Sequence, residues 1–169
     1  MGEVGIVLVI EPHLSSTHLD GAALLGDSGP VIGLTLRQDR LDNFWFVLLH
    51  ELIHIKRHLK KGSIEDIFDE AFSATEGLVD NSGTASDEIE QEADQLAGEA
   101  LIPGEAWNTA LARFIQTEQS VRSFAAEMRI SPAIVAGRVR REANNWIILG
   151  NLVGQGQVRR LFPDVRFGL

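Results

Sequence analysis

Two histidines and a glutamate in the first third of the chain form the pattern His50-Glu51-Leu52-Ile53-His54. In a helix with 3.6 residues per turn, side chains four positions apart lie above one another, so His50 and His54 can bind one metal ion. Glu51 would then lie beside the ion, where it can accept a proton from a metal-bound water instead of acting as a ligand. The pattern indicates a zinc-dependent hydrolase with Glu51 as its general base.

Either histidine alone would more often be a core residue with ordinary hydrogen bonds, but the spacing of both around Glu51 favours the metal site. His58 extends the same row by a further turn. It lies in a basic and more solvated stretch, so we expect it to face solvent or to contact a metal-binding side chain rather than to bind the metal itself.

The segment from Asp42 to Gly62 is expected to be the helix that carries these residues. Asp42 suits the N-cap and Gly62 suits the position after the last helical residue. Basic side chains near the end complement the helix dipole: Lys56, Arg57, Lys60 and Lys61. Apolar residues surround the axis between these ends, which is typical of a buried helix.

A third ligand must come from elsewhere in the chain. The period of apolar residues predicts an amphipathic helix over Ser86 to Leu101, ended by Pro103. At 100° per residue, Glu90 lies about 50° from the centre of the apolar stripe, Asp94 about 90° and Glu92 about 110°. Glu90 is therefore the candidate ligand, with a solvated acidic face as the alternative. Asp94 can accept the free N–H of a ligating histidine.

We interpret the remaining acids of this helix as a solvated face: Glu88, Glu92 and Glu99.

Before the metal-site helix, β-branched and apolar runs predict strands at 4–10, 22–25 and 31–36, with a Gly- and Pro-containing turn over 26–30. The acidic segment 63–85 lacks a clear period, and a connection this long is typical of either a lid or a disordered segment.

Three helical segments are predicted in the last third of the chain, at 107–115, 121–128 and 134–139. Ser131-Pro132 supplies an N-cap and a proline at the first helical position, so the last two segments form a pair resembling a helix-turn-helix. Arginines of the last segment could contact phosphate: Arg138, Arg140 and Arg141. A single such pair in an acidic protein lacks the usual electrostatic footprint, so we do not expect this chain alone to bind DNA. No role for residues 144–169 follows from their sequence.

The composition fits one soluble domain of 169 residues with a sizeable core. The chain has no cysteine, which excludes disulfides and thiolate metal sites. Its net charge is −9, and the charge is unevenly distributed: residues 62–105 hold thirteen acids and no Lys or Arg, whereas 106–169 hold nine Arg and four acids. Apolar runs are too short to span a bilayer and no signal peptide is recognisable, so we expect a cytoplasmic protein.

The segments His50 to His54 and Glu90 to Ala97, the latter leading to Ala100-Leu101-Ile102-Pro103, resemble the ImmA/IrrE family of zinc metallopeptidase-like proteins. Within this resemblance, residues 31–54 are most similar to the C-terminal domain of helix-turn-helix regulators of toxin–antitoxin type. The resemblance implies a zincin-like α+β fold in which a small mixed sheet packs on the buried HExxH helix. It implies a single domain over 1–169, with a metal-site core at 31–103 and a helical part at 104–169.

The family's pattern also implies that Zn²⁺ is held by His50, His54 and Glu90, with Glu51 as the general base. Relatives of this type often carry an N-terminal DNA-binding domain, which this sequence lacks. The chain has no tyrosine to donate to an oxyanion. Stabilisation of the transition state would then fall to His58, an arginine, backbone N–H groups or the metal.

Two functions fit the sequence. The first is a zinc endopeptidase that cleaves a protein partner, such as a helix-turn-helix repressor or an antitoxin encoded nearby. The second is a non-catalytic metal-binding regulatory domain that acts by binding its partner. An intact Glu51 favours the enzyme, because a purely structural metal site needs no base.

Overall fold

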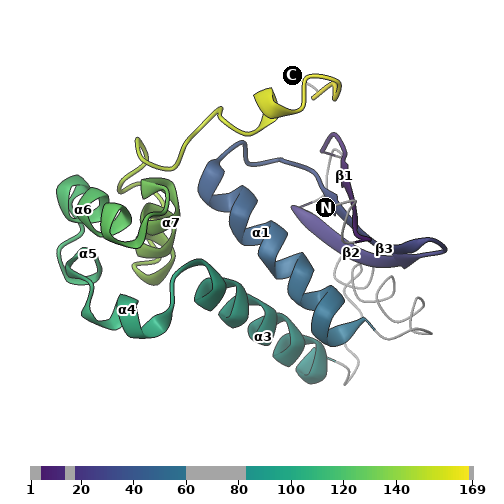
Figure 1. The fold of residues 1–169 in the computed structure, drawn as a ribbon, viewed down its shortest axis with the longest axis horizontal. Helices are drawn as coiled ribbons and strands as arrows, with labels where there is room; N and C mark the ends of the chain where they lie inside the picture. Colours follow the sequence, from purple (N-terminus) through teal and green to yellow (C-terminus); the bar gives the residue numbers. More distant parts are fainter. Residues whose placement is uncertain (1–4, 14–17, 60–82, 168–169) are drawn as a thin grey trace.

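A three-stranded sheet and two long helices form the part of the fold that contains the predicted site (Figure 1). A computed structural model describes residues 5–13, 18–59 and 83–167. The strands are β1 (Val7–Ile10), β2 (Gly21–Gly26) and β3 (Gly29–Leu34), in the order β1-β3-β2. β3 pairs parallel to β1 and antiparallel to β2, which confirms the mixed sheet of an α+β fold.

The helix with His50, α1 (Leu41–Ile53), lies between the sheet and the remaining helices (Figure 1). Its N-cap is Arg40, so the prediction that Asp42 caps the helix is wrong. Asp42 is instead buried within the first turn, where it pairs with Arg40 at 3.1 Å and still complements the helix dipole. Gly62, the predicted helix end, lies outside the described residues.

At His54 the backbone of this helix widens into a π-helix, η2 (His54–His58), which ends at Leu59. π-Helical turns are uncommon and often occur at functional sites. The prediction that the helix is buried on all sides is also wrong, because Trp45 is 42 % exposed. The sheet, α3 and α7 pack against other parts of its surface, and Phe44 contacts Phe162 of the C-terminal segment.

The helix α3 (Gly83–Leu101) runs beside α1 and confirms the predicted helix at 86–101 (Figure 1). Ala93 and Ala97 on α3 are fully buried. Small side chains at a helix contact allow the two axes to approach closely, which brings polar groups on either side of the contact within bonding distance. The predicted irregular connection at 63–85 falls almost entirely on residues outside the description.

Four helices follow: α4 (Gly104–Thr109), α5 (Leu111–Phe114), α6 (Glu118–Met128) and α7 (Pro132–Glu142). The segment predicted as one helix at 107–115 is thus two short ones, separated at Ala110. The predicted pair is present, since α6 and α7 pack together and the Ser131 side chain accepts a hydrogen bond from the Ala133 N–H at 3.2 Å. α7 also packs against α1.

Two hydrophobic clusters form the core, one among α4 to α7 and one between the sheet and α1. The C-terminal segment joins them, because Leu152 and Val153 belong to the first cluster and Val158 belongs to the second. Asp39 Oδ1 accepts the backbone N–H groups of Val158 at 2.9 Å and Arg159 at 3.0 Å. In the part of the chain that the structure describes, no helix has the length and apolar character of a membrane span.

Candidate metal centre

Three donor atoms from α1, η2 and α3 converge at one point. His50 Nε2 lies 2.9 Å from His54 Nε2 and 3.1 Å from Glu90 Oε2, and His54 Nε2 lies 3.3 Å from Glu90 Oε1. Ligand atoms bound to one zinc ion at about 2.0–2.1 Å in tetrahedral geometry are roughly 3.3 Å apart. The three side chains therefore fit a metal ion with little rearrangement.

Glu90 reaches the histidines from the open side of the centre. Its side chain is 56 % exposed, so it does not face the core as its helical phase suggested. The two histidines are only about a quarter as exposed, at 14 % and 15 %. This asymmetry leaves one flank of the donor cluster accessible from solvent, which a site that exchanges substrate requires.

Glu51 lies on the sheet side of the same helix turn and is buried. Its carboxylate accepts the backbone N–H of Ala23 on β2. A Cβ atom at Gly21 would lie 2.8 Å from Glu51 Oε1 and 2.6 Å from a methyl group of Val47, so the absence of a side chain lets β2 approach the carboxylate. Burial raises the pKa of Glu51 to about 7, although the neighbouring His50 and His54 oppose the shift.

The other ring nitrogen of His50 lies 2.9 Å from Asp94 Oδ1, one turn after Glu90 on α3. Burial of the imidazole disfavours its charged form, yet the hydrogen bonds to Asp94 and Glu90 outweigh that effect and raise the pKa of His50 to about 9. The same hydrogen bonds from His50 and His54 hold the pKa of Glu90 well below its usual range. Without a metal, His50 and Glu90 thus form an ion pair.

The geometry agrees with a comparison of the whole chain with protein families. The model of the IrrE N-terminal-like domain, Peptidase_M78, matches residues 2–140. The chain belongs to this family. Among curated proteins, no sequence matches the chain. Membership identifies a metallopeptidase-like domain of a family that is usually metal-dependent.

In this IrrE N-terminal-like domain, His58 is less exposed than its basic surroundings suggested, with 14 % of its side chain accessible. Its Nδ1 lies 3.1 Å from His54 Nδ1, and its Nε2 lies 3.1 Å from Glu92 Oε2. If His58 donates from Nε2 to Glu92, its Nδ1 accepts the Nδ1–H of His54. The Nε2 of His54 then keeps a free lone pair directed at the metal position.

Glu92 is therefore not simply part of a solvated face, since it accepts a hydrogen bond from His58. Two features of the centre lie beyond the sequence reasoning. The first is the hydrogen-bonded chain from His54 through His58 to Glu92, which the i+8 spacing of His58 from His50 could have indicated. The approach of Gly21 and Ala23 to Glu51 depends on how the sheet packs against α1, for which the sequence contains no local signal.

Proposed function

We propose that this domain is a zinc-dependent endopeptidase. The observation that carries the proposal is the convergence of His50, His54 and Glu90 with the buried carboxylate of Glu51 on the next residue of α1. Two imidazoles and one carboxylate are a donor set typical of catalytic zinc, which keeps a further position open. The membership in a peptidase family supports the same reaction.

Each side chain has a distinct task in this proposal. His50, His54 and Glu90 hold the ion, and Asp94 and His58 fix the rings that present Nε2 to it. When bound, zinc would polarise the scissile carbonyl and lower the pKa of a water molecule. Glu51 would accept a proton at its carboxylate and return it to the leaving amine, first as a general base and then as a general acid.

An extended peptide has a place beside these groups. β2 lies at the edge of the sheet, and its residues Gly21 and Ala23 adjoin Glu51. A peptide that reached Glu51 could lie along this edge and pair with it through backbone hydrogen bonds. Such binding recognises a polypeptide main chain and supports a protein substrate. We further propose a helix-turn-helix regulator or an antitoxin encoded nearby as that substrate, on the resemblance to toxin–antitoxin regulators.

The proposal is tested by incubating the zinc-loaded chain with the neighbouring regulator and identifying fragments by mass spectrometry. Glu51→Gln should retain the fold and zinc but cleave about 10²–10⁴-fold more slowly, because the amide cannot accept the proton. Glu105→Gln makes the same chemical change on an exposed part of α4 and should cleave at the wild-type rate. The endopeptidase proposal would be contradicted if Glu51→Gln cleaved at the wild-type rate, or if the wild type still cleaved in the presence of a chelator.

A second candidate is the non-catalytic domain that regulates by binding its partner. An exposed apolar cluster on and after α5 favours it: Leu111, Phe114 and Ile115. Phe114 is 68 % exposed, and contiguous apolar surface of this kind often marks a protein contact. In cells, Glu51→Gln and the wild type can be compared for their ability to relieve repression by the neighbouring regulator. If both relieve it equally, the domain acts by binding its partner and not by proteolysis.

A further inference from the structure

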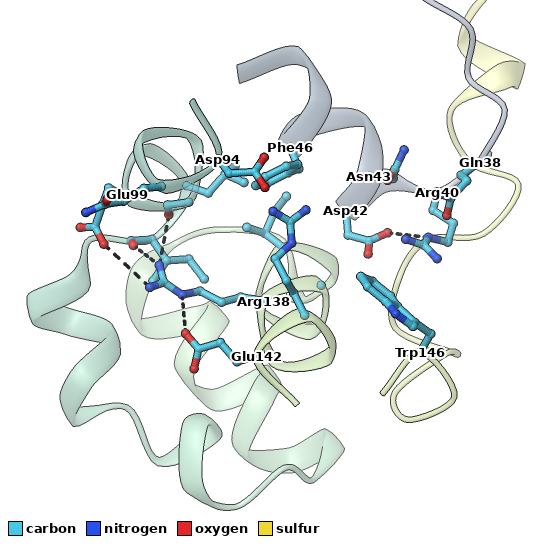
Figure 2. Close-up of a pocket in the computed structure, with 17 residues that line it drawn as sticks. Gln38, Arg40, Asp42, Asn43, Phe46, Asp94, Glu99, Arg138, Glu142 and Trp146 are labelled. Carbon is cyan, nitrogen blue, oxygen red and sulfur yellow. Dashed lines mark hydrogen bonds and ion pairs between the residues drawn. The ribbon is translucent and has the colours of Figure 1, made fainter. Parts of the chain in front are cut away.

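A pocket of about 490 Å³ lies beside the metal centre, between α1, α3, α7 and the start of the C-terminal segment (Figure 2). It adjoins the centre through two residues. Asp94 lines the pocket and also accepts from His50, and Phe46 lines it with its ring centroid 6.2 Å from the His50 ring. The volume is within the range of small-ligand sites, which is about 300–1,000 Å³.

The four acidic side chains that line this pocket already have partners in the described structure. Figure 2 shows Asp42 beside Arg40 and two acids around Arg138. The contacts are Asp42 with Arg40 at 3.1 Å, Asp94 with His50 at 2.9 Å, Glu142 with Arg138 at 3.3 Å, and Glu99 with the Gly104 N–H at 2.7 Å and Arg138 at 3.8 Å. Each acid of the lining therefore already has a partner before a further cation is counted.

Arg141 is that further cation. Its guanidinium carbon lies 3.2 Å from the centroid of the Phe46 ring. Within the described ranges, its guanidinium forms neither a hydrogen bond nor an ion pair with a carboxylate, although the charges of Asp94, Asp42 and Arg138 act on it. The side chain is exposed and lines the pocket. It thus presents donors for planar bidentate recognition of an anion.

Positive charge also accumulates behind the wall of the pocket. Arg140 is only 5 % exposed, and its Nε and Nη1 have no hydrogen-bond partner in the described structure. Arg40 and Arg140 lie 5.9 Å and 5.8 Å from the Trp146 ring, which lines the pocket. Three arginines are therefore grouped near the carboxylate of Asp42, and an anion at this end of the pocket would balance the local excess of positive charge.

We propose that the pocket binds an anionic group carried on a flat apolar body, with Arg141 as the counter-ion. Phe46, Ile134 and Ile102 supply apolar wall for the body, and Trp146 supplies an aromatic surface beside it. The anion can belong to a small carboxylate or to an acidic side chain of a bound peptide. This binding does not depend on the proposed peptidase reaction, since none of the three metal donors lines the pocket.

Isothermal titration calorimetry of the zinc-loaded chain tests the proposal with two probes of equal shape, 4-phenylbutanoate and its neutral amide. The wild type should bind the carboxylate at least tenfold more tightly than the amide. Arg141→Met keeps an apolar stem over Phe46 without the charge, and it should abolish this preference. A carboxylate bound to the zinc ion instead would keep its preference in Arg141→Met, which would overturn the proposal.

Two further variants distinguish the effect of the Arg141 charge from the effect of the pocket volume. Gly98 lines the pocket and a Cβ there would contact nothing within 4 Å, so Gly98→Leu should fold, fill the pocket and weaken both probes. Arg122→Met removes an exposed arginine of α6 that does not line the pocket, and should bind as the wild type does. Unchanged zinc content and melting temperature would show that the variants are folded.

The source of the anion is decided by a second pair of probes, acetylated tetrapeptides that differ only by Glu or Gln at one position. A preference for the Glu peptide that disappears in Arg141→Met would assign the pocket to acidic side chains. A preference confined to 4-phenylbutanoate would assign it to small carboxylates. Equal binding of charged and neutral members in both pairs, or no binding of either, would overturn the proposal.

Discussion

His50 is the side chain on which the geometry of the centre depends most. Asp94 and Glu90 engage its two nitrogens from successive turns of α3, so the ring is oriented before any metal binds. The imidazole of His54 is oriented differently, through His58 and Glu92. Both arrangements leave Nε2 directed at one point, which lowers the entropic cost of binding an ion.

The raised pKa of His50 predicts how metal binding depends on pH. Because the metal-free imidazole stays protonated up to a pH of about 9, an ion must displace a proton to bind. Zinc affinity should therefore fall about tenfold for each pH unit below about 9. Competition with a fluorescent chelator from pH 6 to pH 9 measures this slope.

The variant Asp94→Asn tests the cause of this pH dependence, since it removes the negative charge that lies beside His50. The pKa of His50 should then fall and the pH dependence should flatten. We also expect zinc affinity at high pH to decrease by about 10–100-fold, as is common when a partner of a ligating histidine is lost. An unchanged slope in Asp94→Asn would show that Asp94 does not set the protonation of His50.

The spacing of residues was enough to predict which groups meet at the centre. His50, His54 and Glu90 were predicted from an i, i+4 pair and from the phase of an amphipathic helix, and the structure brings them together. The burial of these residues was harder to predict. Glu90 is exposed and His58 is covered, and both properties depend on how η2 packs against α1 and β2 and on the position of α3 beside α1.

At the scale of elements, the approach of α7 to α1 depends on Gly137. A Cβ there would lie 2.7 Å from the Asp42 Cβ, closer than side chains pack. Gly137→Ala should therefore force the helices apart and destabilise the fold by about 1–3 kcal/mol. Gly98→Ala on α3, where a Cβ meets nothing, should instead stabilise it by about 0.5–1 kcal/mol.

Chemical denaturation of both alanine variants measures the difference. The free energy of unfolding should fall in Gly137→Ala and should rise or stay constant in Gly98→Ala. Equal values for the two variants would mean that α7 can move away from α1 without cost.

Local periodicity predicted most of the elements but not their irregular parts. Runs of β-branched and apolar residues located all three strands, and the Ser131-Pro132 start of α7 was predicted from capping chemistry. The widening to a π-helix at His54 and the break at Ala110 were not predicted. Both change the hydrogen bonding of a helix without changing its apolar period, so the period contains no signal for them.

At the scale of the whole molecule, the C-terminal segment holds the two parts of the core together. No role for residues 144–169 could be inferred from their sequence, because a segment without a period has no recognisable face. In the structure, Val158 is buried against the sheet, and Arg159 donates to the backbone carbonyls of Leu36 and Arg37. The fold therefore extends beyond residue 140, where the family match ends.

A chain ending at Glu142 should accordingly lose cooperative unfolding or melt at a much lower temperature. It would lack Leu152, Val153 and Val158, and large losses of buried apolar surface cost about 2 kcal/mol or more for each side chain. A chain ending at Phe167 keeps every one of these contacts and should melt as the full chain does. Circular dichroism during heating compares the three, and a cooperative transition at the full-length temperature for the shorter chain would refute the role of this segment.

We propose that His50, His54 and Glu90 hold one catalytic zinc ion, and native mass spectrometry of the zinc-equilibrated chain counts the bound ions. The wild type should carry one zinc ion, and Glu90→Ala should carry none. Glu92→Ala changes an acid half a turn away that contacts His58 but not the donor cluster, and it should retain the ion. Zinc retained by Glu90→Ala and lost from Glu92→Ala would contradict the assignment of the ligands.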